Sequence, residues 1–249
     1  MKSMDRREFL CAGAVLGVAS ASRSAFSLGW GRPWETPDLV IRGATVFDGS
    51  GAPGVEADVS ILGDRIQAVG RVTERGVREL NFQGQALAPG FIDIHTHADL
   101  PLLSNPRAEN RVLQGITLEV GGQCGSSPGP TSEGSARASR DRYWERYEVE
   151  VDLRELGGFF DALEAIPPAV NAASMVGHGT IRSLVVGSED RPATPEELAR
   201  MRQLVATALS QGAVGFSSGL EYTPSGFASR EELVEIAKAL RGTGYPYAS

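Results

Sequence analysis

Short apolar segments alternate with longer helical patterns from Ala88 onward, and this alternation constrains the fold more than any other feature of the sequence. The apolar segments, which are typical of strands, are Gly90 to His95, Thr117 to Val120, Val170 to Val176, Gly212 to Ser217 and a last start at Tyr245. Helical patterns lie between them, near Arg107 to Gln114, Arg137 to Leu163, Thr194 to Gln211 and Ser229 to Arg241. Strands that alternate with helices predict an α/β fold with a parallel sheet and right-handed crossovers.

Two of the predicted helices carry recognisable start signals. Thr194, followed by Pro195 and then by Glu197, fits an N-cap with proline at the first helical position. Ser229, with Glu232 three residues later, fits a capping box. These residues predict where the third and fourth helical patterns begin.

Residues 38–87 have a different pattern, in which β-rich segments are separated by tight turns. The segments are Asp38 to Arg42, Ala44 to Phe47, Asp58 to Leu62 and Arg65 to Val69, with Gly and Asp between them. Such runs are hairpin signals. They predict a small β domain over 38–87, joined by a linker over 26–37 to the N-terminal segment, and a second domain over 88–249.

The N-terminal residues 1–25 have the layout of an export signal. Arg6 and Arg7 precede an apolar stretch, Phe9 to Ala21, that ends in a small-x-small cleavage pattern. The arginine pair resembles the twin-arginine signal and predicts an exported, periplasmic protein with no membrane attachment after cleavage. A short N-terminal anchor is the alternative. Cleavage near Ala21 would remove Cys11 and leave Cys124 as the sole cysteine, which is then buried, reactive or metal-bound.

The charge balance bears on the class of partner. The formal net charge is −7 and the isoelectric point is near 5.1. A nucleic-acid binder normally shows a basic face, so this balance argues against nucleic acid as a partner.

His95 and His97 form an H-x-H pair at the end of the first apolar segment of the second domain. On a strand, residues i and i+2 share one face, so the two imidazoles can chelate one ion. An H-x-H pair by itself is more often a pair of ordinary surface or core histidines. The third histidine of the chain is His178.

Four motifs occur in an order that resembles one protein family. Leu87 to His97, the G-x-C-G-x-S-P run around Cys124, Val176 to Arg182 and Gly215 to Pro224 together resemble the D-aminoacylase branch of the amidohydrolase superfamily. Members of that branch are metal-dependent enzymes on a TIM-like barrel that remove the acyl group from N-acyl-D-amino acids. The resemblance extends from Asp38 to the last residue. It implies the first half of a TIM-like (β/α)8 barrel, preceded by part of a small β-sandwich domain.

The resemblance implies a zinc site of one or two ions with His95, His97 and Cys124 as ligands. Related hydantoinase-like enzymes bridge two metals with a carboxylated lysine after the fourth strand, but the lysines here are Lys2 and Lys238 only. That region therefore holds no lysine for such a bridge, and Cys124 is the better candidate. Glu221 is a possible further ligand, although a solvated or arginine-paired glutamate is the alternative.

Three more residues are candidates for substrate binding. Tyr222 matches the tyrosine of the family's G-L-x-Y-x-P motif, with a packed loop aromatic as the alternative. His178 is a candidate for the pocket or for the layer behind the metal ligands, with a purely structural histidine as the alternative. Arg182 is a candidate partner for a substrate carboxylate.

The number of predicted strands is small for a complete barrel, which takes about 250 residues. Residues from 88 onward accommodate four β/α units and the start of a fifth. The general-base aspartate of the family is expected beyond Ser249, so we expect this chain to be an inactive N-terminal portion of a zinc-dependent deacylase. The alternatives are another amide hydrolase of the superfamily, dipeptidase-like or cyclic amidase, and a non-catalytic exported protein that binds a metal or a partner.

Overall fold

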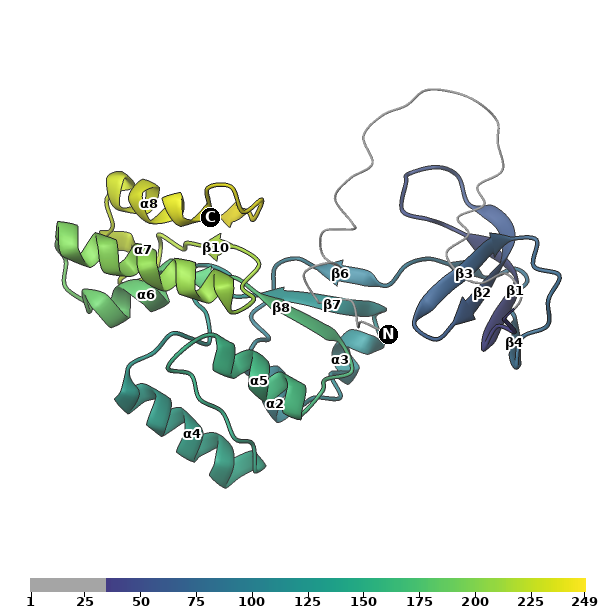
Figure 1. Ribbon diagram of the computed structural model, residues 1–249, viewed down its shortest axis with the longest axis horizontal. Helices are drawn as coiled ribbons and strands as arrows, with labels where there is room; N and C mark the ends of the chain where they lie inside the picture. Colours follow the sequence, from purple (N-terminus) through teal and green to yellow (C-terminus); the bar gives the residue numbers. More distant parts are fainter. Residues whose placement is uncertain (1–34) are drawn as a thin grey trace. The chain divides into compact units, whose positions relative to one another are not determined.

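The computed structural model describes residues 35–249, which divide into two compact units between Pro89 and Gly90 (Figure 1). The division lies two residues after the boundary predicted at 87/88. The predicted export signal over 1–25 and most of the predicted linker lie outside the described residues. Within 35–249, no helix combines the length and the apolar character that a membrane span requires.

The first unit is one five-stranded sheet. Its strands are β1 Leu39–Val46, β2 Val55–Leu62, β3 Arg65–Gly70, β4 Arg78–Asn81 and β5 Ala86–Leu87. β3, β2 and β1 are antiparallel neighbours, whereas β4 and β5 both pair with β1 in parallel. The two strands predicted within 38–47 are one strand with a bulge between Ile41 and Ala44, where the Gly43 amide donates to Asp58 Oδ1 at 2.9 Å.

The second unit contains two three-stranded parallel sheets. β6 Phe91–Asp93, β7 Ile116–Gly121 and β8 Asn171–Ser174 pair in that order. β9 Val176–Gly177, β10 Phe216–Ser217 and β11 Tyr247–Ala248 form the other sheet, with β10 in the middle. Only Met175 separates β8 from β9, so the strand predicted over 170–176 is divided there. Neighbouring strands follow one another along the chain, which is the order of a β/α barrel.

Helices connect these strands. They are α2 Pro101–Ser104, α3 Glu109–Val112, α4 Glu133–Tyr147, α5 Gly157–Ala165, α6 His178–Val185, α7 Pro195–Ser210 and α8 Arg230–Ala237, with 3-10 turns η1 Ser225–Phe227 and η2 Lys238–Leu240. The single helical pattern predicted over 137–163 is wrong. Glu148 takes a left-handed φ of 55° and ends α4. The segment that follows buries Val149, Val151 and Leu153, whose spacing of two fits an extended chain and not a helix.

The predicted start of α7 is confirmed, and that of α8 is confirmed in part. Thr194 and Glu197 form a complete capping box, with Pro195 at the first helical position. At α8 the Ser229 hydroxyl accepts from the Glu232 amide at 3.1 Å. The Glu232 carboxylate does not return to the backbone of Ser229, because it forms a buried contact elsewhere in the unit.

Candidate metal centre

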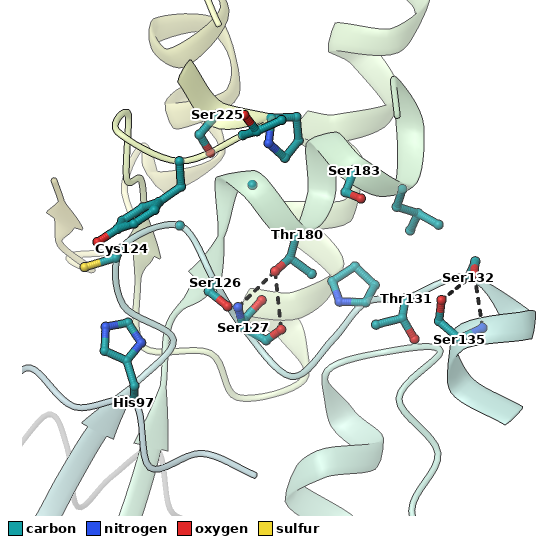
Figure 2. A pocket seen from close by; sticks show the side chains of 17 residues that line it. His97, Cys124, Ser126, Ser127, Thr131, Ser132, Ser135, Thr180, Ser183 and Ser225 are labelled. Carbon is teal, nitrogen blue, oxygen red and sulfur yellow. Dashed lines mark hydrogen bonds between the residues drawn. The ribbon is translucent and has the colours of Figure 1, made fainter. Parts of the chain in front are cut away.

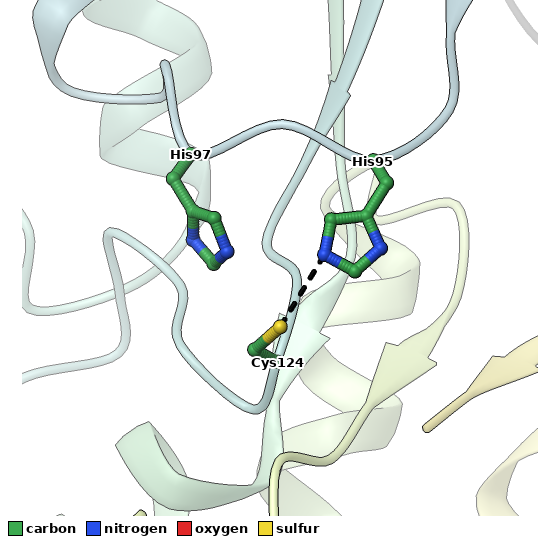
Figure 3. A group of neighbouring side chains, drawn as sticks. All are labelled: His95, His97 and Cys124. Atoms are coloured by element: carbon green, nitrogen blue, oxygen red, sulfur yellow. Dashed lines mark hydrogen bonds between the residues drawn. The ribbon is translucent and has the colours of Figure 1, made fainter.

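His95, His97 and Cys124 come together at the carboxyl ends of β6 and β7 (Figure 3). One ligand atom from each residue lies within 4.8 Å of the others, and Cys124 Sγ lies 3.3 Å from His95 Nε2. The strand was predicted to extend to His95, but β6 ends at Asp93. Both histidines therefore lie on the loop after the strand. Asp93 Oδ1 accepts from the His95 amide at 3.1 Å, and this contact turns the chain out of the strand.

The three donors fit a zinc ion. Two imidazoles and one thiolate are a donor set typical of zinc, which is borderline soft. In a tetrahedral site with bonds of about 2.3 Å to sulfur and about 2.05 Å to nitrogen, those two atoms lie roughly 3.6 Å apart. The 3.3 Å between Cys124 Sγ and His95 Nε2 is close to that separation. Both histidines are exposed and Cys124 is half-buried, so an ion can reach them from solvent.

The backbone of the cysteine loop is held in an unusual conformation. Cys124 has a φ of 52°, in the left-handed region that costs a side-chain-bearing residue energy. Ser217 of β10 holds this loop, because its hydroxyl accepts from the Gly125 amide at 3.1 Å and donates to the Gly122 carbonyl. The loop also lies so close to Gly219 that a Cβ there would stand 2.2 Å from the Cys124 carbonyl oxygen. Packing from the next strands therefore supports the strained cysteine.

A network around Arg111 supports the histidine segment. Arg111 of α3 pairs with Glu119 of β7 at 2.6 Å and with Asp93 at 3.6 Å. It also donates to the hydroxyl of Thr96, the buried residue between the two histidines, at 3.2 Å. Burial raises the pKa of the Glu119 carboxyl above its ordinary value, against the attraction of Arg111. Sequence reasoning did not identify Arg111 or Glu119, because helix and strand positions alone do not show which charges meet.

A pocket of about 610 Å³ opens beside the donors (Figure 2). His97, Cys124 and Tyr222 form part of its wall. Nine hydroxyl-bearing residues form much of the rest: Ser126, Ser127, Thr131, Ser132, Ser135, Thr180, Ser183, Thr223 and Ser225. Its lining holds no lysine, arginine or carboxylate among the described residues. The serine-rich segment after Cys124 supplies several of these hydroxyl groups. It begins within the G-x-C-G-x-S-P run that marks Cys124 in the sequence.

Of the neighbouring candidates Glu221 and Tyr222, only the tyrosine lies at the site. Tyr222 is on the pocket wall and is 58% exposed. Glu221 is exposed, and its carboxylate belongs neither to the pocket lining nor to the group of donors around His95. The structure therefore does not support Glu221 as a metal ligand. The loop that presents Tyr222 to the pocket leaves the preceding side chain outside it.

The structure does not support Arg182 as a partner for a substrate carboxylate, and it favours the structural alternative for His178. Both side chains are 0% exposed, and both lie outside the pocket lining. His178 Nε2 and Arg182 Nε each donate to Glu232 Oε1 at 3.0 Å. Arg182 also donates to the Arg191 carbonyl, so its guanidinium is committed to the interior and does not reach a substrate carboxylate.

Glu232 is the residue that sequence reasoning missed in this buried cluster. Burial opposes ionisation of its carboxyl, but the hydrogen bond from His178 and the charge of Arg182 outweigh it and hold its pKa below the ordinary value of 4.5. The cluster contacts the pocket wall through Ser225, whose Oγ lies 3.0 Å from His178 Nδ1.

Comparisons with known proteins place the chain in one family. Residues 78–243 match a family model described as "Amidohydrolase family". A D-aminoacylase from Alcaligenes xylosoxydans xylosoxydans is 40% identical over 217 residues, which cover 85% of this chain and 44% of that protein. A crystal structure of D-aminoacylase matches with a TM-score of 0.77 and 40% identity over 86% of this chain and 45% of that one.

A second solved structure is an N-acyl-D-glutamate deacylase from Bordetella bronchiseptica, complexed with zinc and a phosphonate inhibitor that mimics the tetrahedral intermediate. It matches with a TM-score of 0.76 and 32% identity, over 86% of this chain and 45% of that one. The chain thus spans less than half the length of these relatives. The likeness in fold confirms the predicted fold class, an α/β chain that forms strands of a TIM-like barrel after a small β domain.

Proposed function

Because this chain belongs to the amidohydrolase family, we propose that its metal centre serves the zinc-dependent hydrolysis of the amide bond of N-acyl-D-amino acids. The observation that carries the proposal is the convergence of His95, His97 and Cys124 from two loops onto one point. The D-aminoacylase and the N-acyl-D-glutamate deacylase that the chain resembles support this choice of substrate class.

Some residues of the site would hold the metal, and others would bind the substrate. His95, His97 and Cys124 would hold one zinc ion, and a second ion would need donors in addition to these three. Zinc in such a site supplies a Lewis acid for the scissile carbonyl and lowers the pKa of a bound water toward about 7. The pocket wall next to His97 and Cys124 is where the acylated amino acid would lie.

The uncharged lining of the pocket suits an uncharged part of the substrate. Hydroxyl groups donate to and accept from an amide or a neutral side chain, whereas a carboxylate buried there would have no cationic partner among the lining residues. Tyr222 would pack its ring against this part of the substrate. We assign the substrate carboxylate to other groups, since Arg182 is committed to Glu232.

The acid–base step needs a residue outside the donor group. Within residues 35–249, no carboxylate belongs to the group formed by His95, His97 and Cys124. We therefore propose the activity for the protein in which the barrel is complete, with an aspartate as general base, as the family resemblance implies.

Export is a separate proposal. The paired Arg6 and Arg7 before an apolar stretch support a twin-arginine signal and a periplasmic enzyme. N-terminal sequencing of the secreted protein should find a start near residue 22. A periplasmic protein that still begins at Met1 would instead support an N-terminal anchor.

A substrate panel tests the proposed reaction. The zinc-loaded protein with the complete barrel should release free amino acid from N-acetyl-D-amino acids with neutral side chains. It should be at least tenfold less active on the matching L-enantiomers. Turnover of cyclic ureides alone would overturn the proposal in favour of a cyclic amidase, and zinc binding without any turnover would favour a non-catalytic metal protein.

A further inference from the structure

The relative position of two loops sets the metal centre. His95 and His97 lie on the loop after β6, whereas Cys124 lies on the loop after β7. The two loops are connected covalently only through the residues between His97 and Cys124, which include α2, α3 and β7. Hydrogen bonds that cross from one loop to the other therefore fix how close the donors lie, together with the Thr96 amide, which donates to the Val120 carbonyl of β7 at 3.3 Å.

One crossing bond starts beside the cysteine and ends beside the first histidine. Gln123, which directly precedes Cys124, is 3% exposed. Its amide nitrogen donates to the carbonyl of Ile94, which directly precedes His95, at 2.9 Å, and to the carbonyl of Val120 at 3.3 Å. Both partners are carbonyl oxygens, so only the NH2 end of the amide can face them. A side chain of this length without a donor would leave the half-buried contact to the Ile94 carbonyl unmade.

A second crossing bond starts after the second histidine and ends before the cysteine. Asp99 Oδ2 accepts from the Gly122 amide at 3.1 Å, and its Oδ1 accepts from the Ser174 hydroxyl at 3.0 Å. The carboxylate lies directly over Gly121, where a Cβ would stand 2.0 Å from Oδ1. The absence of a side chain at that position is what lets the carboxylate reach the cysteine loop.

These two contacts bracket the histidine pair. One is attached at Ile94, just before His95, and the other at Asp99, two residues after His97. We propose that Gln123 and Asp99 are positioning residues, which hold the thiol and the imidazoles in chelating geometry before zinc arrives. This inference rests on the proposed zinc function of the same three ligands.

The test is zinc and cobalt binding by the intact protein. Gln123→Met keeps the length and bulk of the side chain and removes the donor, and Gln123→Glu keeps the shape while replacing the donor with an acceptor. Loss of a residue that orients metal ligands typically costs roughly 10–100-fold in affinity. We expect a loss of that size in the zinc dissociation constant of both variants, measured by competition with a chromophoric chelator.

Cobalt gives a readout that a merely structural role would not move. A thiolate bound to Co²⁺ produces a near-ultraviolet charge-transfer band, and this band should weaken in Gln123→Met when the protein is saturated with cobalt. Asp99→Asn keeps one acceptor oxygen and should lie between wild type and Gln123→Met. Gln114→Met is the matched control, because Gln114 is an exposed glutamine whose amide donates only to the nearby Asn110 carbonyl.

The outcomes separate the two proposals. If the wild-type protein binds zinc and shows the band but Gln123→Met and Gln123→Glu are unchanged, the positioning role is wrong and the metal centre stands. If the wild-type protein shows no thiolate band, the metal centre itself fails. Should Gln123→Met not fold, Gln123→Glu decides the question, and wild-type affinity in Asp99→Asn would remove Asp99 from the proposal.

Discussion

The three histidines of this chain lie in two opposite environments within one unit. His95 and His97 are exposed, and the Cys124 thiol lies 3.3 Å from His95 Nε2. His178 is fully buried between Ser225 and Glu232. The exposed pair is arranged to receive a ligand from outside, whereas the buried histidine already has its partners.

This difference separates binding from stability. Breaking the buried cluster leaves charged or polar groups without partners in the interior, which is costly. Removing one of the exposed imidazoles leaves no buried charge or polar group without a partner in the described part of the folded protein. The cluster around Glu232 should therefore govern stability, and the group around Cys124 should govern metal affinity.

The largest effect is expected from Glu232→Ala. It leaves Arg182 buried without its carboxylate and should lower the free energy of unfolding by roughly 3–5 kcal/mol. Urea denaturation measures this loss. The zinc dissociation constant, measured where the variant remains folded, should stay close to that of wild type.

Glu235→Ala is the matched control for that variant. Glu235 lies one turn further along α8, but its pairs with Arg202 and Lys238 are at the surface. Its removal should change stability little, because exposed ion pairs contribute little. Equal losses in the two variants would show that the buried cluster has no special role.

A smaller effect concerns pH. The pKa of Glu232 is lowered in the folded protein, so the stability it contributes is present above its ordinary pKa of 4.5 and is lost as pH falls through the folded value. The difference in unfolding free energy between wild type and Glu232→Gln should therefore be constant near neutral pH and shrink below about pH 4.5. A difference that grows as pH falls would contradict the assigned direction.

The sequence predicted the exposed group around Cys124 better than the buried cluster around Glu232. His95 and His97 could be paired because they lie two residues apart at the end of a predicted strand. The family resemblance added Cys124 to them, and its place after the next strand agrees with that assignment. The α/β class with a parallel sheet followed from the alternation of strands and helices, and the family resemblance implied the TIM-like barrel. The extended segment inside 137–163 was missed, since its spacing of two was hidden between two helical stretches.

The buried cluster could not be predicted in the same way. Glu232 lies 54 residues from His178, and Ser229 three residues before it indicated only a capping role. Arg182 was predicted to bind a substrate carboxylate, but it turns into the interior. Its position near a helix start does not show which way the side chain points. Burial and long-range pairing decide these roles, and neither is encoded in local spacing.

The central claim is that Cys124 and the histidine pair bind one zinc ion together. X-ray absorption at the zinc edge of the intact, zinc-loaded protein tests it most directly. We expect one sulfur neighbour at about 2.3 Å and nitrogen neighbours at about 2.0–2.1 Å, with the sulfur lost and the nitrogens kept in Cys124→Ser. A zinc ion without a sulfur neighbour in the wild-type protein, or a sulfur neighbour that persists in Cys124→Ser, would contradict the account.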